Sequence, residues 1–318
     1  MNPVRESIRH VVENSRHVAV NQEGIESFVR DFDKNKLNHW LSISPFGINS
    51  LTDTEKLNFV LVLDSISFSY WGCPKWEIDY HGKIYDGAQG MMAALGRAVE
   101  SGKPILDTNY LAGMGRKGLE GILRGNIEIP LLDERQRILN EAGLALVGKY
   151  GGDCSKLLEK ADGSAMKLVS LLIGQFPSFR DSSAYHGMEI YFNKRAQLLA
   201  SDLHHAFEGK GYGRFYDIEE LTALADYKLP QVLRRWNVLA YSPELKAKIL
   251  GKADLIEGSS EEVEIRASTI HAVELIKEML KKKIPDITAA KINDYLWLEG
   301  QKKLPGGEPY HRVRTTKY

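Results

Sequence analysis

Apolar residues recur at helical spacing along most of the chain, and this periodicity limits the possible folds more than any other feature. Within residues 52–70, for example, Phe59, Val62, Leu63 and Ile66 fall on one face of a helix. Such a face has to be buried against other elements, so we expect a long buried helix there. The same pattern predicts further helices within residues 2–51, 91–102, 119–125, 131–150, 161–176, 192–207, 217–225, 230–239, 243–250, 259–280 and from 288 onward.

Only residues 76–85 alternate as a strand does, around a turn at His81 and Gly82. This pattern predicts one β-hairpin near residues 76–86, and therefore a small sheet. We expect a mainly α protein with a helical bundle-like fold and this one small β element, resembling the helical DNA glycosylases. No internal repeat or low-complexity linker divides the chain, so residues 1–318 are expected to form a single domain. Its tail is rich in Pro and Gly from Leu304.

Charge and cysteine content narrow the possible partners. Lys plus Arg and Asp plus Glu both number 42, so the formal net charge is zero, which does not support a nucleic-acid or anionic-membrane partner. Two isolated cysteines, Cys73 and Cys154, indicate a reducing compartment. The N-terminal residues lack the apolar run of a signal peptide, and no segment approaches the ~18 apolar residues of a membrane span. We therefore expect a cytoplasmic protein, of unknown oligomeric state.

Motifs for metal, cofactor and triphosphate chemistry are missing from the sequence. It contains no GK[ST] phosphate loop, no HExxH, no CxxC and no G-x-S-x-G. Residues 113–118 match G-x-G-x-x-G, but no buried strand precedes them, so we predict a loop and not a dinucleotide site. The adjacent His204 and His205 would point about 100° apart on a helix and cannot share a metal. We expect no metal and no cofactor, which leaves carboxylate chemistry in an aromatic-lined pocket.

The predicted helix at 192–207 carries one acidic residue toward its buried side. Asp202 lies within about 60° of Leu198 and Ala206 around the helix axis. A carboxylate in apolar surroundings is costly unless it is paired, and burial raises its pKa. The position suits a catalytic base, and it also suits a structural aspartate held by Arg195 or by a backbone donor, which is the commoner role of a single buried acid.

A second acidic residue, Asp226, lies at a corner between two predicted helices. Asp217 is a suitable N-cap for the first of these, with Glu220 three positions on. The second begins near Pro230, because proline suits the first turn of a helix. The corner places Asp226 beside the positive end of the second helix, where an anion is stabilised. Asp226 is therefore either a functional acid or the cap of that helix.

The residues around these two acids resemble a known family. KRAQLLASD at 194–202 and ADYKLPQVL at 225–233 resemble the queuosine salvage family, the queuosine 5′-phosphate N-glycosylase/hydrolases. The resemblance covers nearly the whole chain, through NFVLVLDSISFSYW (58–71), PLLDERQRILNEAG (130–143), FPSFRD (176–181), EVEIRAS (262–268), NDYLW (293–297) and HRVRTTKY (311–318). It implies an N-glycosyl hydrolase that splits the small molecule queuosine 5′-phosphate into queuine and ribose 5-phosphate, in service of tRNA modification.

The implied reaction gives the two acids possible roles. Glycoside cleavage passes through an oxocarbenium-like state, which a carboxylate can stabilise while it orients or deprotonates water. The 7-deazapurine base lacks the ring nitrogen where a purine leaving group is most easily protonated, so its other polar edges have to be stabilised. We assign Asp202 to the sugar and water, and Asp226 to the base edge or the sugar hydroxyls. The sequence leaves open which acid does which.

Two further sets of residues are predicted to contact the substrate. Cationic side chains would bind the 5′-phosphate, and aromatic side chains would enclose the planar base. The cationic set is Lys194, Arg195, Lys228, Arg266, His311 and Arg312, and the aromatic set is Phe68, Trp71, Phe192, Tyr227, Tyr295 and Trp297.

Two positions depart from the family pattern. Ser67 stands where an asparagine is usual, and Ala88 and Gln89 follow Gly87 where aromatic residues are common. These changes would reshape the base pocket, so a related 7-deazapurine nucleotide or nucleoside is the alternative substrate. Two other hypotheses stay open: a helical protein that binds or excises bases in nucleic acid, and a module that binds the base without catalysis. The zero net charge argues against the first of these.

Overall fold

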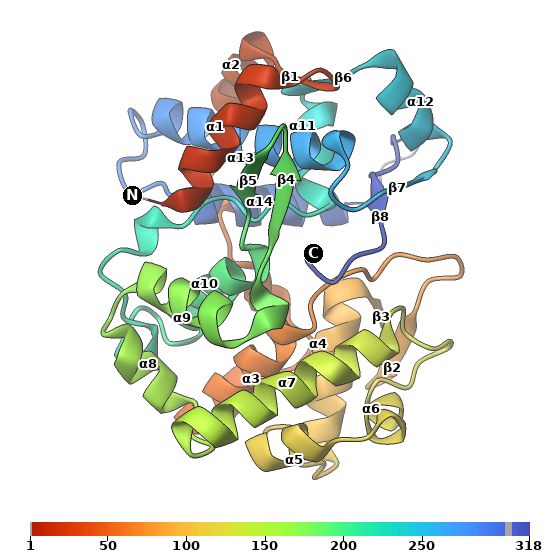
Figure 1. Ribbon diagram of the computed structural model, residues 1–318, viewed down its shortest axis with the longest axis vertical. Helices are drawn as coiled ribbons and strands as arrows, with labels where there is room; N and C mark the ends of the chain where they lie inside the picture. The colour runs from red at the N-terminus through yellow and green to blue at the C-terminus, as the bar shows by residue number, and fades with distance from the viewer. Residues whose placement is uncertain (1, 303–306) are drawn as a thin grey trace.

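Helices account for most of the structure, a computed structural model that describes residues 2–302 and 307–318 (Figure 1). The predicted mainly α class is confirmed. The helices are α1 Pro3–Asn14, α2 Gln22–Asp31, α3 Asp53–Ser65, α4 Gly87–Glu100, α5 Thr108–Gly113, α6 Arg116–Ile122, α7 Leu132–Tyr150, α8 Ser155–Ala161, α9 Ala165–Gln175, α10 Lys194–Ala206, α11 Lys228–Arg235, α12 Pro243–Leu250, α13 Ser260–Leu280 and α14 Ala289–Gln301. The strands are β1 Val18–Val20, β2 Glu77–Tyr80, β3 Lys83–Asp86, β4 Ser182–Tyr185, β5 Met188–Tyr191, β6 Leu239–Tyr241, β7 Asp254–Leu255 and β8 Arg312–Val313. The start of the Pro- and Gly-rich tail at Leu304 lies outside the described residues.

Short strands pair two by two in the described part of the chain. The β2–β3 hairpin is the predicted one, with Glu77 opposite Asp86. The expectation of a single β element is wrong, because β4 and β5 form a second hairpin while β1–β6 and β7–β8 pair across long stretches of sequence. Strands of two or three residues, such as β1, β6, β7 and β8, carry too few side chains to show an alternating pattern, and the sequence of β4, Ser-Ser-Ala-Tyr, does not alternate between polar and large apolar residues. The β4–β5 turn at His186 and Gly187 has positive φ angles of 46° and 82°, the backbone of a tight hairpin turn.

Buried hydrophobic residues form two clusters, which occupy the lower and upper halves of the molecule in Figure 1. The lower cluster gathers α3, α4, α7, α9 and α10. The upper cluster gathers α1, α2, α11, α13 and α14. Trp297 of α14 packs against both clusters, so α14 lies where they meet. That residues 1–318 form one domain stays a prediction.

Local capping signals start three helices where the sequence predicts them. Ser242, Ser259 and Thr288 each accept a hydrogen bond from the backbone N–H three residues on, at 3.2, 3.3 and 3.2 Å. The loop predicted at 113–118 is limited to Met114 and Gly115, because α5 ends at Gly113 and α6 begins at Arg116; as predicted, no strand directly precedes this stretch. Among the described helices, none is both long and apolar enough to cross a bilayer.

The helix predicted at 52–70 is shorter in the structure, where α3 ends at Ser65. Arg135 of α7 is fully buried and donates hydrogen bonds to the backbone carbonyls of Ile66 and Phe68. Its guanidinium also lies 4.2 Å from the centre of the Phe68 ring. These carbonyls would otherwise be buried without donors, so the cation stabilises a loop in place of further helical turns. The aromatic residues of 68–71 thereby come to lie on a loop.

Candidate active site

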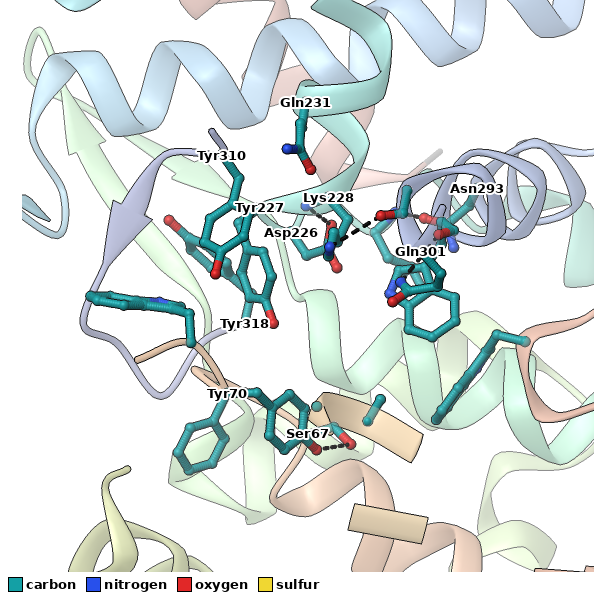
Figure 2. A pocket seen from close by; sticks show the side chains of 18 of the residues that line it. Ser67, Tyr70, Asp226, Tyr227, Lys228, Gln231, Asn293, Gln301, Tyr310 and Tyr318 are labelled. Carbon is teal, nitrogen blue, oxygen red and sulfur yellow. Dashed lines mark hydrogen bonds between the residues drawn. The ribbon is translucent and has the colours of Figure 1, made fainter. Parts of the chain in front are cut away.

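A cavity of about 360 Å³, a size that fits a small-molecule ligand, has walls built by residues of both clusters (Figure 2). The wall is made by the loop after α3, the start of α4, the first turn of α10, the residues before α11, one face of α14 and the last residues of the chain. Of the predicted site residues, those that line it are Phe68, Trp71, Lys194, Asp226, Tyr227, Lys228 and Trp297. Residues that line it and that we did not predict include Trp40, Tyr70, Lys75, Gln231, Asn293, Asp294, Tyr310 and Tyr318.

The chain reaches this cavity through an extended segment where we predicted a helix. The prediction for 217–225 is wrong, since only Ile218–Glu220 form a single 3-10 turn. Asp217 does not cap a helix of its own. Its carboxylate accepts hydrogen bonds at 2.6 Å from the Ser164 hydroxyl and from the backbone N–H of Ala165, at the start of α9. A capping residue engaged elsewhere leaves the intended helix without its start signal.

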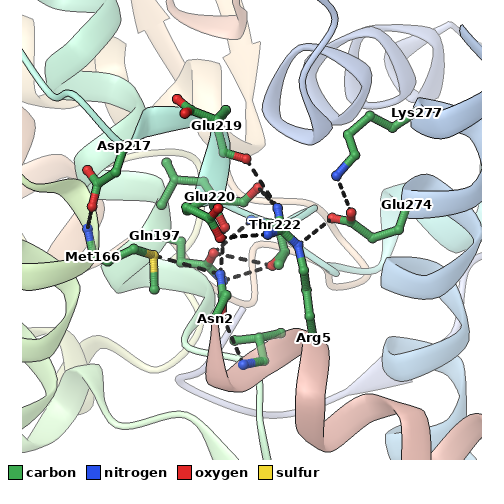
Figure 3. Close-up of polar contacts among 12 residues, drawn as sticks. Asn2, Arg5, Met166, Gln197, Asp217, Glu219, Glu220, Thr222, Glu274 and Lys277 are labelled. Carbon is green, nitrogen blue, oxygen red and sulfur yellow. Dashed lines mark hydrogen bonds and ion pairs between the residues drawn. The ribbon is translucent and has the colours of Figure 1, made fainter. Parts of the chain in front are cut away.

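Side chains from two other helices hold this extended segment in place. Gln197 of α10 accepts from the backbone N–H of Thr222 at 2.9 Å and donates to its hydroxyl at 3.0 Å (Figure 3). Asn293 of α14 accepts from the backbone N–H of Leu224 at 2.9 Å. These bonds hold two backbone N–H groups of the segment in place of helical bonds, and the segment leads to Asp226 on the cavity wall.

Asp226 combines the two roles that the sequence left open. Its Oδ1 accepts hydrogen bonds from the backbone N–H groups of Lys228 (2.7 Å) and Leu229 (3.1 Å), so it caps α11. The cap also explains why α11 begins at Lys228 and not near Pro230. No described residue donates a hydrogen bond to Oδ2. Burial raises the pKa of Asp226, while the positive charge of Lys194 and the two backbone donors oppose that rise.

Lys194 lies among carboxyl groups and not at an obvious phosphate site. It is the first residue of α10, and it is buried. Burial lowers the pKa of Lys194, and the negative charges of Asp226, Asp64 and Asp202 act in the opposite direction. Lys194 therefore places one positive charge near three acidic side chains, where it favours their ionised forms.

Asp202 does not line the cavity but lies directly behind its wall. The residue is fully buried, and its Oδ1 accepts a 2.9 Å hydrogen bond from the indole N–H of Trp40, which does line the cavity. Arg195 does not hold it. Burial and the neighbouring Asp64 carboxyl raise the pKa of Asp202 well above its ordinary value, and burial raises the pKa of Asp64 to about 8. With a pKa of about 8, the Asp64 carboxyl holds a proton at neutral pH.

Three of the predicted phosphate-binding cations lie outside the cavity wall and have structural partners. Arg266 forms a two-bond ion pair with Asp181 (2.8 and 2.6 Å). Arg195 donates to the backbone carbonyls of Ser65 and Ser178. Burial lowers the pKa of His311 to about 3, so this residue carries no charge to offer a phosphate.

Three more predicted contacts also lie outside the wall. Arg312 has its guanidinium 5.6 Å from the Trp71 ring. Phe192 packs beneath the Arg266 guanidinium at 3.9 Å, and Tyr295 packs against Phe32 with ring centres 4.6 Å apart. The sequence identifies these side chains as cationic or aromatic, but it does not predict which residue each one contacts in the folded chain.

Arg266→Met should destabilise the fold by about 3–5 kcal/mol, because it leaves the buried Asp181 carboxylate without its counter-ion. Urea-induced unfolding followed by circular dichroism measures the loss. The matched control is Arg30→Met, which removes an ion pair to Asp31 whose side chains are 70% and 48% exposed. That control should cost no more than about 1 kcal/mol. Equal stabilities of the two variants would contradict a structural role for Arg266.

Both departures from the family pattern lie on the cavity wall. Ser67 and Ala88 line it, and the Ser67 hydroxyl donates to the backbone carbonyl of Leu63 at 2.8 Å. The Tyr70 hydroxyl in turn donates to the Ser67 hydroxyl at 3.1 Å. A serine at this position thus fixes an aromatic side chain of the wall.

Comparison with known proteins identifies the family of this chain. Residues 48–318 match the family model described as queuosine salvage protein. The chain is 40% identical to the queuosine 5′-phosphate N-glycosylase/hydrolase of Sphaerobacter thermophilus, over 98% of this chain and 96% of the relative. It is 36% identical to the protein of the same name from Mus musculus, over 99% and 98% of the two chains, and 32% identical to that from Dictyostelium discoideum over the full length of both. The chain belongs to the queuosine salvage protein family.

Proposed function

We propose that this chain hydrolyses the N-glycosidic bond of queuosine 5′-phosphate and releases queuine and ribose 5-phosphate for queuosine salvage. Family membership and the shared name of the three relatives support this activity. Within the chain, the observation that carries the proposal is the carboxylate of Asp226. It lies beside Lys194 on an aromatic-lined cavity, with one oxygen bound to the backbone and the other open.

The open oxygen of Asp226 suits the attack of water on the sugar. As the bond from C1′ to the base nitrogen breaks, its electron pair leaves with the base and positive charge develops on the sugar. Asp226 Oδ2 stabilises that charge and accepts a proton from the water that forms the new C1′–O bond. Lys194 favours the ionised form of Asp226 that this step needs.

Asp202 takes an indirect role in this proposal, because it does not reach the cavity. Its hydrogen bond fixes Trp40, and its charge acts on Lys194. We therefore move the contact with sugar and water from Asp202 to Asp226, and we treat Asp202 as a positioning residue. The polar edges of the base are then left to other groups on the wall, such as Asn293 and Gln231.

Planar side chains and one cation suit the remaining parts of the substrate. Phe68, Trp71, Tyr227 and Trp297 offer aromatic surfaces to the deazapurine ring. Lys228 is the remaining predicted phosphate contact on the wall, and among the described residues its ammonium group donates to one neutral acceptor, the Gly300 carbonyl, at 3.1 Å. It is therefore free to pair with a phosphate at the start of α11.

Queuosine without its 5′-phosphate should be cleaved at least about 100-fold more slowly than queuosine 5′-phosphate, because it forfeits the charge-assisted bonds to Lys228. Free base is measured by mass spectrometry, with guanosine 5′-phosphate as a test of base recognition. Lys228→Met should shrink the ratio between the two substrates, whereas Lys83→Met on the exposed strand β3 should leave it unchanged. Equal rates for both substrates would remove the phosphate site from the proposal.

The walls of the cavity favour one alternative substrate. Because Ser67 and Ala88 replace larger side chains of the family pattern, a related 7-deazapurine nucleotide or nucleoside is the second candidate, and the same assay distinguishes it. Binding of queuine with no base released from any nucleotide would instead favour a non-catalytic module. The zero net charge supports the absence of a nucleic-acid partner. A cytoplasmic location stays a prediction.

A further inference from the structure

The acidic side chains on the wall of the candidate active site differ in the partners that they have. Within the described residues they are Asp86, Asp226, Asp294 and Glu308. The first pairs with Lys75 at 2.5 Å and the last pairs with Arg234, so each of these two carboxylates has a counter-ion. Asp226 and Asp294 are buried, and neither forms an ion pair with a described lysine or arginine. These two acids are therefore the ones whose protonation the local surroundings have to set.

Hydrogen-bond donors distinguish the two buried acids. Asp226 Oδ1 accepts bonds from two backbone N–H groups, at 2.7 and 3.1 Å. Asp294 receives one hydrogen bond in the described part of the chain, from the side-chain amide of Asn293 to Oδ1 at 3.3 Å. Donors that point at a carboxylate stabilise its negative charge. They therefore favour the ionised form at position 226 more strongly than at position 294.

The imidazole of His39 also faces Asp294, but it adds neither a hydrogen bond nor a positive charge. Its Nδ1 accepts a 3.2 Å hydrogen bond from the backbone N–H of Leu41, so the neutral ring carries its proton on Nε2. Nε2 lies 3.6 Å from Asp294 Oδ2, which is too far for a hydrogen bond. Burial, followed by the charges of His205 and His204, lowers the pKa of His39 well below its ordinary value, so the ring is neutral at physiological pH.

The surroundings thus separate the protonation of two acids that share one cavity. Burial, followed by the charge of Asp202, raises the pKa of Asp294 well above its ordinary value, and only the Asn293 amide opposes that rise. Burial also raises the pKa of Asp226, but there the charge of Lys194 and the two backbone donors oppose it. One acid that keeps its proton beside one that gives it up is the arrangement that general acid–base catalysis needs.

We propose that Asp294 is a second catalytic residue, the general acid that protonates the departing base. This role rests on the proposed hydrolysis. As the bond from C1′ to the base nitrogen breaks, its electron pair passes to the base, and the carboxyl proton of Asp294 moves to a nitrogen of the base. The oxygen of water forms the new bond to C1′, and one proton of that water passes to Asp226. After the products leave, Asp294 takes a proton from solvent and Asp226 releases one, so each cycle consumes one water.

The chemistry of the base explains why a positioned acid is needed here. A 7-deazapurine lacks the ring nitrogen at which a purine leaving group is most easily protonated. Without a proton from another source it would have to depart as an anion, which is a poor leaving group. A protonated carboxyl on the cavity wall supplies that proton as the bond breaks.

Asp294→Asn tests this role, because the amide keeps the shape of a neutral carboxyl but cannot act as an acid. With queuosine 5′-phosphate, kcat should fall at least about 100-fold while KM is unchanged. The comparison substrate is 7-methylguanosine 5′-phosphate, whose positively charged base departs as a neutral molecule and needs no proton. Asp294→Asn should cleave this nucleotide at the wild-type rate. Asp226→Asn should lose activity on both substrates, because each requires the attack of water.

A second measurement uses queuosine 5′-phosphate alone. Asp294→Ala should regain turnover as formate is added, because formic acid fits the space left by the carboxyl and can supply the proton. The matched control is Asp286→Asn, which alters an exposed acid ahead of α14 that pairs with Lys291 at 2.7 Å. This control should behave as the wild type on both substrates.

The outcomes separate an acid from a residue that only supports the fold or binds the base. Full activity of Asp294→Asn on queuosine 5′-phosphate, or a change in KM alone, would overturn the acid role and leave the proposed function intact. An equal loss on both nucleotides with no rescue of Asp294→Ala by formate would do the same. A wild-type protein that releases no base from queuosine 5′-phosphate would overturn both the acid role and the proposed function.

Discussion

Asp226→Asn should abolish base release, with a loss on the order of 10³-fold or more, while the fold is unchanged. Asparagine is as good a helix cap as aspartate, so the bonds to the N–H groups of Lys228 and Leu229 survive. What disappears is the negative oxygen that accepts the proton of water. Single-turnover assays with queuosine 5′-phosphate measure the rate, and circular dichroism checks the fold.

The matched control is Asp107→Asn, a second aspartate that caps a helix, with Oδ1 accepting from the N–H groups of Asn109 and Tyr110. It directly precedes α5, does not line the cavity, and should keep full activity. Wild-type rates should fall as the pH drops through the pKa of Asp226, because only the ionised form accepts a proton. Since burial raises this pKa, the fall should begin at a higher pH than for an ordinary aspartate, whose pKa is 3.8. Full activity of the Asp226→Asn variant would contradict the proposed mechanism.

Lys194→Met should lower turnover at neutral pH by about 100-fold, because it removes the cation that offsets Asp226, Asp64 and Asp202. Without that charge, the pKa of Asp226 should rise further, and the acid limb of the pH–rate profile should move to higher pH. In the wild type, activity should also decline at alkaline pH as Lys194 loses its proton. Its lowered pKa places that decline below the ordinary lysine value of 10.5.

The displacement of the acid limb is the decisive measurement for Lys194. A residue that only filled space would reduce the rate without changing the pH at which activity appears. Lys167→Met serves as the control, because this side chain is half exposed and 4.0 Å from Asp162, far from any role in the cavity wall. An unshifted acid limb in Lys194→Met would mean that other groups set the ionisation of Asp226.

Short-range signals predicted much of this structure. The caps at Ser242, Ser259 and Thr288 act within three residues, so the sequence around each one contains the whole interaction. The β2–β3 hairpin is equally local. The early end of α3 depends instead on Arg135, which is distant in sequence. No sequence pattern near Ser65 predicts that a buried arginine from another helix binds the backbone there.

The candidate site shows the same division between local and distant information. Asp226, which lines the cavity, was predicted because its corner and the family resemblance both mark it. Asp64 and Asp294 were missed, although each is an acid within an apolar helical stretch, which is the signal that drew attention to Asp202. Applied to every helix, that signal would have found all three. The partner of Arg266 could not have been found in this way, because 85 residues separate it from Asp181.

In the proposed mechanism one carboxylate serves both a helix and the reaction, and this has a consequence for how this enzyme can vary. With Oδ1 tethered to the first turn of α11, the rotation of the Asp226 side chain is already arrested before any nucleotide arrives. Glutamate, one methylene longer, keeps the charge but cannot hold both oxygens where they now lie. The length of the side chain at position 226 is therefore as tightly constrained as its charge.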